Sequence, residues 1–375
     1  MNPRYVPILR TKQGEFEAYS LLEDEIKRET LPLFELSQFT DTMRARVRFQ
    51  TVTNPLEIYI GEVAAKIHAA VGSSSVITDI FKWAPNSTIE NGEHVLAYLT
   101  SCLTGLGSSV IPVIGYERWG DREYSSVLKG LSSKYSQFCL RLESYAFEDM
   151  VEERHFLENI NDIIDSMGLD VTKCCLILDF GATQLPIVDI EEKLSEALAL
   201  LSPYKFGFIS IAGCSVTVMV NDMVSERDTT GLVVRKEMIV WKSNRRFNAQ
   251  SKLVFGDYGV VNPDMKDDVK AKHANCKIRY TTQEKHFVVR GHSKQEGWDQ
   301  MYGLCQTLMG SPYYLYPSFS WGDAQIEKCA NGKFTGNATK WVSFDLNHHI
   351  TYVIAEVFEV ERSLEVGKVK AIAKA

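Results

Sequence analysis

The sequence contains no apolar run near the roughly 18 residues that a membrane-spanning helix needs. Its first residues lack the basic stretch and apolar core of a signal peptide. Its eight cysteines include no Cys-x-x-Cys pair, so neither a zinc site nor a disulfide framework is indicated. We therefore expect a cytoplasmic protein without a membrane partner.

Local catalytic motifs are missing as well. The chain has no His-x-x-x-His, no Asp-x-Asp and no Gly-x-x-x-x-Gly-Lys-Ser/Thr phosphate loop. Any reaction must therefore be inferred from residues that the fold brings together.

Short apolar runs that end in a polar residue recur along the chain, and amphipathic stretches of helical length separate nearly all of them. Alternation of strands and helices is typical of a parallel sheet, and eight such units predict a closed (β/α)8 barrel. The predicted strands are Tyr5–Arg10, Leu31–Glu35, Ser75–Asp79, Val110–Tyr116, Phe138–Glu143, Cys174–Asp179, Phe206–Ser210 and Leu253–Asp257.

Barrels of this kind carry their active sites at the C-terminal ends of the strands. The residues that end the predicted strands should therefore meet at one mouth. The catalytic candidates there are Glu35, Asp79, Glu143, Asp179 and Asp257, and the binding candidates are Arg10 and Arg141.

The length of 375 residues exceeds one barrel of about 250 residues. We assign residues 1–260 to the barrel, with an irregular seventh unit in which a loop at 214–230 precedes a helix at 231–243. Residues 261–375 are predicted to form an extension packed on the barrel. It contains a hairpin at 276–290, helices at 294–309 and from Ser320, and a last helix from Ala338 to about Val360.

Several carboxylates around one cavity repel one another, so their charge must be offset. A divalent cation such as Mg²⁺ or Mn²⁺ would do this and would suit phosphoryl chemistry. General acid–base catalysis without a metal is a second interpretation. The third is a structural ion network in which Arg10, Lys82 and Arg141 pair with the carboxylates.

Three histidines are further candidates. His348 and His349 lie about 100° apart on the predicted last helix, so they cannot share one site as i,i+4 ligands would. His349 falls on the apolar face, which favours a core position. His292 follows the hairpin in a loop beside Arg290 and is the better catalytic candidate.

Charge is unevenly distributed along the chain. Residues 1–234 carry 20 Lys and Arg against 33 Asp and Glu, whereas residues 235–294 carry 14 against 6. Aromatic residues are interleaved with this basic block, a pattern that suits single-stranded nucleic acid or another polyanion. A solvated face and a subunit interface are the alternatives. The cations of the block include Lys242, Arg245, Arg246, Lys270, Lys272, Lys277, Arg279 and Arg290.

Two stretches of the sequence resemble the beta family protein of bacteria and phages. The first is Tyr5–Ala18 with Leu31–Glu35, and the second comprises Ser320–Asp323, Gly336–Trp341 and Asn347–His349. The resemblance implies a bacterial or phage source and a place in phage–host conflict. It also marks signature positions as site candidates, namely Arg10, Lys12, Glu35, Asp323, His348 and His349.

These observations lead to two hypotheses. The first is a phosphoryl-type hydrolase or nuclease-like protein that acts on nucleic acid or nucleotide. The second is a non-catalytic recognition or assembly subunit of an antiviral defence complex, with a protein partner, in which the barrel is a binding platform. Acidic strand ends beside a basic block favour the first, and the missing motifs favour the second.

Overall fold

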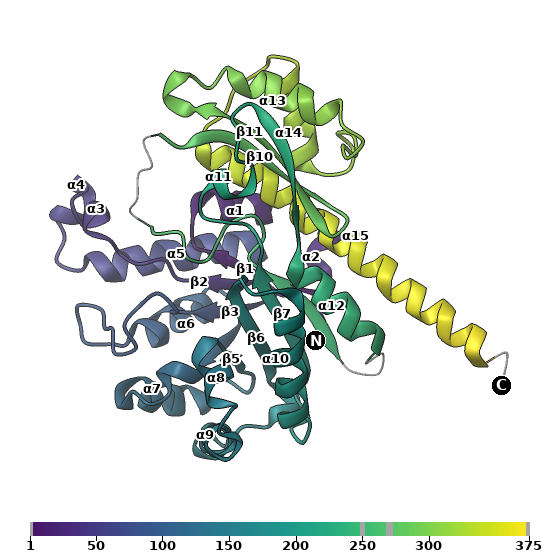
Figure 1. Ribbon diagram of the computed structural model, residues 1–375. Helices are drawn as coiled ribbons and strands as arrows, with labels where there is room; N and C mark the ends of the chain where they lie inside the picture. The colour runs from purple at the N-terminus through teal and green to yellow at the C-terminus, as the bar shows by residue number, and fades with distance from the viewer. Residues whose placement is uncertain (1–2, 248–251, 268–272, 373–375) are drawn as a thin grey trace.

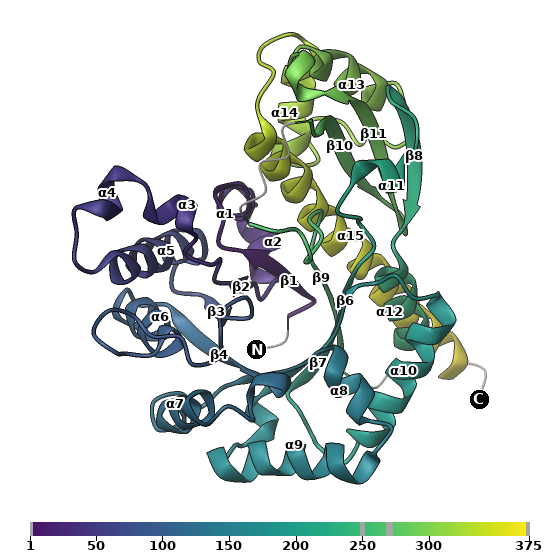
Figure 2. The ribbon, with the colours of Figure 1, turned by 60° about the vertical axis from the view of Figure 1, so that its left-hand side comes forward.

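The computed structural model describes residues 3–247, 252–267 and 273–372. Its centre is a closed barrel of parallel strands surrounded by helices, so the predicted (β/α)8 architecture is confirmed (Figures 1 and 2). The strands follow one another around the barrel in chain order: β1 (Tyr5–Arg10), β2 (Leu33–Glu35), β3 (Ser75–Asp79), β4 (Ser109–Gly115), β5 (Cys139–Leu142), β6 (Cys175–Ala182), β7 (Phe208–Cys214) and β9 (Leu253–Asp257).

Helices follow the barrel strands and form an outer ring (Figure 2). Between β1 and β2 the chain forms two helices, with a break after Ser20. None of the helices in the described ranges has the length and apolar character needed to cross a membrane. The helices up to β7 are α1 (Gln13–Ser20), α2 (Asp24–Arg28), α3 (Asp41–Arg44), α4 (Val47–Gln50), α5 (Pro55–Val71), α6 (Val95–Gly105), α7 (Arg122–Ser132), α8 (Ser144–Asp149), α9 (Glu153–Met167) and α10 (Ile187–Leu200).

Alternation along the strands separates the barrel interior from the outer shell. The interior cluster includes Leu33 of β2 and Ile77 of β3, whereas Phe34 and Val76 belong to the shell cluster under the helices. Since side chains of a strand alternate between its faces, residues two positions further along point inward again. This period of two directs the side chains at the strand ends toward the barrel axis.

The extension is a three-stranded antiparallel sheet in the order β10-β11-β8, packed with short helices. Its strands are β8 (Thr229–Val234), β10 (Asn275–Thr282) and β11 (Lys285–Ser293), and its helices are α11 (Val220–Met223), α13 (Gln300–Met309) and α14 (Trp321–Ala330). The predicted hairpin is confirmed as β10 and β11.

The seventh unit differs from the prediction. The helix expected at 231–243 begins only at Lys236, as α12 (Lys236–Phe247), because residues 229–234 pair with β11 instead. These six residues are mostly threonine and valine, which favour strands. A segment between two barrel strands thus contributes to the extension sheet.

The last helix, α15 (Ala338–Ile372), is the long diagonal helix of Figure 1. It extends past the predicted end near Val360. Its side chains Leu346, Ile350 and Val353 join the same apolar cluster as the barrel shell. It therefore serves as the eighth barrel helix, and most of the extension is inserted between β9 and this helix.

The crossing of α14 and α15 predicts a sensitive position. A Cβ atom on Gly322 would lie 2.3 Å from the backbone carbonyl oxygen of Phe344. We expect Gly322→Ala to lower the free energy of unfolding by about 1–3 kcal/mol, because the backbones must separate. In α5, Gly61→Ala is a matched control with open space around the added methyl. Denaturant unfolding measures both, and equal stability of the two variants would contradict the close packing.

Candidate functional site

Arg141 of β5 lies on the barrel axis and is fully buried. Its guanidinium donates hydrogen bonds to Asp79 Oδ2 at 2.7 Å, Glu35 Oε1 at 2.7 Å and Asp179 Oδ2 at 2.6 Å. The three carboxylates come from three different strands, β3, β2 and β6. One guanidinium thus joins strands on opposite sides of the barrel.

A second guanidinium extends this network. Arg118, in the turn after β4, donates to Asp79 Oδ1 at 2.6 Å and lies 4.0 Å from Glu143 Oε1. The same Glu143 oxygen lies 3.3 Å from Arg141 Nε. The hydroxyl of Tyr258 donates to Asp179 Oδ2 at 2.6 Å. We call Glu35, Asp79, Arg118, Arg141, Glu143, Asp179 and Tyr258 the mouth network.

Four carboxylates face only two guanidinium groups in this network, so its charges do not balance if all are ionised. Burial raises the pKa of Glu143 to about 8 against the opposing effect of both arginines. Burial likewise raises the pKa of Glu35. For Asp79 the two arginines outweigh burial, and its pKa lies below the usual value. Glu143 therefore retains its proton at pH 7, and Glu35 is the least compensated carboxylate that remains.

The mouth network does not fit a divalent metal. Within the described ranges, no group of three or more His, Cys, Asp or Glu side chains is placed to hold a metal ion. The guanidinium of Arg141 lies where the carboxylates converge, and it supplies the positive charge that Mg²⁺ or Mn²⁺ was expected to supply. Of the three interpretations of the strand-end carboxylates, this geometry matches the ion network. Its members differ from those expected, because Arg118 takes part and Arg10 does not.

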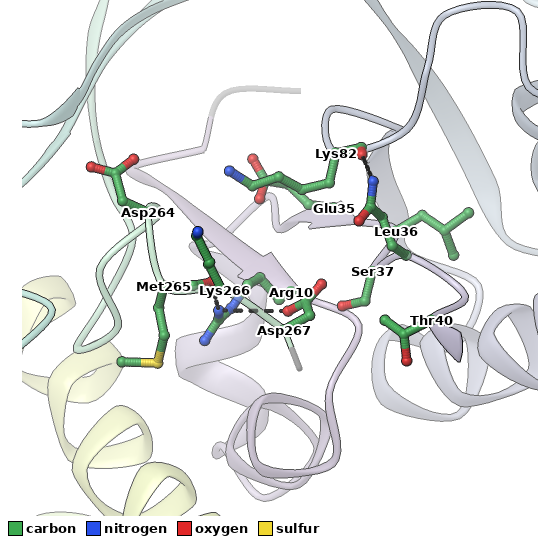
Figure 3. A pocket seen from close by; sticks show the side chains of 11 residues that line it. Arg10, Glu35, Leu36, Ser37, Thr40, Lys82, Asp264, Met265, Lys266 and Asp267 are labelled. Carbon is green, nitrogen blue, oxygen red and sulfur yellow. Dashed lines mark hydrogen bonds and ion pairs between the residues drawn. The ribbon is translucent and has the colours of Figure 1, made fainter. Parts of the chain in front are cut away.

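A cavity of ≈ 300 Å³ opens beside the network, on the side of β1 and β2 (Figure 3). Arg10 donates to the carbonyl oxygen of Met265 at 3.2 Å and lies 3.9 Å from Asp267. Lys12 also pairs with Asp267. These contacts fix the loop after β9 over the mouth. The cavity is lined by Arg10, Glu35, Leu36, Ser37, Gln38, Thr40, Lys82, Asp264, Met265, Lys266 and Asp267.

Several polar groups of this cavity have no partner within the described residues. The Oε2 atom of Glu35 and the Oγ atom of Ser37 are buried and form no hydrogen bond. Lys82 and Lys266, in contrast to Arg10, form no ion pair in the described part of the chain. A buried polar atom without a partner is costly, so these groups favour a bound polar molecule.

Asp257 does not face the mouth. Its neighbours Gly256 and Tyr258 take the inward positions of β9, and Asp257 points to α15, where His349 Nε2 donates to it at 2.9 Å. Burial alone would raise the pKa of Asp257. His349 and nearby Arg235 outweigh burial and lower this pKa from its usual value to about 2. The Thr281 hydroxyl lies 2.7 Å from His349 Nδ1. This group connects β9, α15 and β10.

His348 serves a parallel connection in the extension. Its Nδ1 lies 2.8 Å from Asp323 Oδ2, and its Nε2 lies 2.9 Å from the carbonyl oxygen of Thr281. Both partner atoms are oxygens that accept hydrogen bonds, so each ring nitrogen is placed to donate. The ring stacks on Tyr280 with centroids 3.7 Å apart. The two histidines are thus buried connectors of α15, outside the mouth network.

His292 lies at the end of β11, where its Nδ1 is 2.9 Å from Asp228 Oδ1. It belongs neither to the mouth network nor to the cavity lining.

The basic block is largely committed to internal contacts. Lys242 lies 2.7 Å from Glu356, and Arg279 lies 3.0 Å from Asp345. Arg290 donates to the backbone carbonyl oxygens of Val224 and Ser225, both at 2.6 Å.

Those three cations are buried. Arg245 lies 3.7 Å from Glu361, and burial lowers the pKa of Lys277 to about 8. Arg246 is exposed, whereas Lys270 and Lys272 lie outside the described residues. Nucleic-acid binding by the basic block stays a prediction. Its buried members, Lys242, Arg279 and Arg290, are not placed to contact a nucleic acid.

The sequence analysis missed several residues of the site, among them Ser37, Tyr258, Arg118 and Lys266. Tyr258 lies two positions after Gly256, so strand alternation continued by one step would have found it. Arg118 and Lys266 lie in connecting segments, where no periodicity indicates which residues turn toward the mouth.

The mouth network makes a prediction about stability and pH. We expect Arg141→Met to lower the free energy of unfolding by about 3–5 kcal/mol at pH 7, because buried carboxylates lose their partner. Without the guanidinium, their folded-state pKa values rise above the unfolded values of about 4. The difference in free energy of unfolding between wild type and variant should therefore be largest at neutral pH and decrease as the pH falls toward about 4.

Urea unfolding of the variant and the wild type between acid and neutral pH measures this trend. Arg154→Met is the matched control, because Arg154 is on the surface with its side chain 93% exposed. A deficit that is the same at every pH would contradict the carboxylate explanation.

The sequence can now be compared with known proteins. A family model described as Beta protein matches residues 5–355. No curated protein matches the chain. Because the match includes all the barrel strands and most of the extension, this chain belongs to the Beta protein family.

Proposed function

We propose that the cavity at the barrel mouth binds a small phosphorylated ligand of the nucleotide class. The observation that carries the proposal is the pair of buried atoms without a partner among the described residues, Glu35 Oε2 and Ser37 Oγ, in a cavity also lined by Lys82 and Lys266, for which the described residues provide no ion pair. The cavity lies at the C-terminal ends of β1 and β2, where barrels of this class bind their ligands.

The charges of the cavity favour a ligand with both phosphate and hydroxyl groups. Lys82 and Lys266 would hold phosphate oxygens. Glu35 and Ser37 would accept hydrogen bonds from sugar hydroxyl groups, as carboxylates do for ribose in other nucleotide sites. The volume of ≈ 300 Å³ is at the lower end of small-molecule sites, which span about 300–1,000 Å³. A folded nucleic-acid segment would exceed this space, so a mononucleotide is the better fit.

Hydrolysis of the bound phosphate ester is the leading form of this proposal. In this form the Oε2 atom of Glu35 would accept a proton from the attacking water instead of a hydrogen bond from the sugar, a role that needs a carboxylate with a raised pKa beside the substrate. The water oxygen would bond to phosphorus as the ester P–O bond breaks, and the leaving oxygen would take its proton from solvent. Burial gives Glu35 such a pKa. The remaining carboxylates would act through Arg141, which holds Glu35 in place.

Recognition without turnover is the second candidate. It is favoured by the mouth network itself, because Arg141 already engages Asp79 and Asp179 and leaves neither carboxylate to act on a ligand. In this form the occupied cavity would present a surface to a protein partner. Resemblance to beta proteins of bacteria and phages supplies the setting of phage–host conflict and antiviral defence. The eight cysteines are free, as in the reducing cytoplasm, which we propose as the location.

The binding proposal predicts that the two unpaired lysines carry affinity. We expect wild-type protein to bind nucleoside mono- or diphosphates in isothermal titration calorimetry. Lys82→Ala and Lys266→Ala should each weaken binding by about 10-fold, the loss expected for a charged hydrogen bond to phosphate.

Lys134→Ala is the control, since Lys134 is exposed just after α7 and does not line the cavity. Absence of any nucleotide binding by wild-type protein would contradict the proposal as a whole. Equal losses of affinity in Lys82→Ala, Lys266→Ala and Lys134→Ala would show that the phosphate does not bind in the cavity.

Glu35→Gln separates hydrolysis from recognition. We expect this variant to bind nucleotide with nearly unchanged affinity and to release phosphate about 10²–10⁴-fold more slowly, the usual contribution of a general base.

Wild-type protein that binds nucleotide but releases no phosphate would reject hydrolysis and leave recognition. Exposed Glu158→Gln is the matched control for the substitution itself.

A further inference from the structure

The extension sheet has one open edge. β8 pairs with β11 on one side, and in the described part of the chain no strand pairs with its other side. The opposite edge strand, β10, packs against α15. In Figure 2, β8 lies at the outer margin of the sheet, away from the barrel. β8 is therefore the edge of the sheet that is open to another chain.

The direction of each backbone N–H and C=O group along this edge follows from the hydrogen-bond pattern between β8 and β11. The N–H of Arg235 donates to Glu284 on the β11 side at 2.8 Å. Because alternate residues of an antiparallel strand bond the same neighbour, Thr230, Leu232 and Val234 direct their N–H and C=O groups outward. The same three residues are exposed, with Leu232 44% and Val234 40% accessible.

Edge strands of soluble proteins are usually protected by charge, proline or a bulge. β8 has none of these within Thr229–Val234, and its pairing with β11 is regular. Six residues with free backbone groups and apolar side chains suit the addition of another strand.

We propose that β8 is the interface of a homodimer, in which β8 of a second copy of this chain pairs with it in antiparallel register about Leu232. This register places Leu232 opposite Leu232 of the second copy and Thr230 opposite Val234. Every outward backbone group of the three residues then finds a partner, and the three-stranded sheet becomes a continuous six-stranded sheet.

Charge at the ends of the strand supports a second copy rather than an unrelated strand. Exposed Asp228 precedes β8 and half-buried Lys236 follows it, each four residues from Leu232. Both side chains already have partners in their own chain, Asp228 in His292 and Lys236 in the backbone carbonyl oxygens of residues 183–185. Antiparallel pairing about Leu232 still places the carboxyl end of one β8 beside the ammonium end of the other. A parallel arrangement would bring like charges together.

The interface is small. Strand addition alone buries less than the roughly 1,200–2,000 Å² of a standard stable interface, so we expect a reversible dimer with a dissociation constant on the order of 10 µM. The inference concerns a surface remote from the mouth cavity and does not depend on the nucleotide proposal.

Sedimentation equilibrium of the full chain tests the dimer. Wild-type protein should shift from monomer to dimer as its concentration passes through this range. Leu232→Lys should remain monomeric, because two lysines would face each other across the two-fold axis. Val188→Lys is the control, since Val188 is 70% exposed on α10, outside the extension sheet. A wild type that is monomeric at about 300 µM overturns the proposal.

Cross-linking tests the register. Residues paired by hydrogen bonds across antiparallel strands have Cα atoms about 5.5 Å apart, within the range of a disulfide. Leu232→Cys should therefore form a covalent dimer under mild oxidation that dithiothreitol reverses. Val188→Cys and the wild type, whose cysteines are buried or half-buried, should not. Equal cross-linking of Leu232→Cys and Val188→Cys overturns the proposed pairing.

Discussion

The buried guanidinium of Arg141 is the constraint on which the mouth of this barrel depends. An arginine removed from water at the centre of a protein costs several kcal/mol unless charged partners surround it. The partners here come from β2, β3 and β6, so they meet only when the sheet closes. The hydrogen bonds of Arg141 to these three carboxylates can therefore form only when the barrel closes. Removing one partner would leave a buried charge, which is why the network tolerates few changes.

This constraint also determines where a ligand can lie. In a barrel with an empty mouth, strand-end side chains would surround a central cavity. Here Arg141 and its carboxylates fill the axis, and the open space is displaced toward β1, β2 and the loop after β9. Glu35 belongs to both regions, because Oε1 accepts from Arg141 while Oε2 has no partner. A ligand in the cavity would therefore affect the mouth network through the carboxylate of Glu35.

Much of the barrel was predictable, because the alternation of short apolar runs with stretches of helical length is a local property of the sequence. The residues that end the runs include Glu35, Asp79 and Asp179, which do lie at the mouth. The same choice failed for β9, because strand alternation turns Gly256 and Tyr258 inward and Asp257 consequently faces α15. β8 was not predictable in this way, since it is a strand only through its pairing with β11, some fifty residues later in the chain. Local pattern does not reveal such partners.

The basic block shows why net charge along a sequence does not locate a surface. Some of its cations face carboxylates of α15, as Lys242 and Arg235 face Glu356 and Arg279 faces Asp345. The eighth barrel helix is separated from its strand β9 by the inserted hairpin and two helices, so a short connection does not position it. Buried ion pairs are weak sources of net stability, but their geometry is demanding. Carboxylates of α15 that meet buried cations of the basic block would therefore fix the helix in one position, and part of the positive charge at 235–294 is explained by these internal pairs.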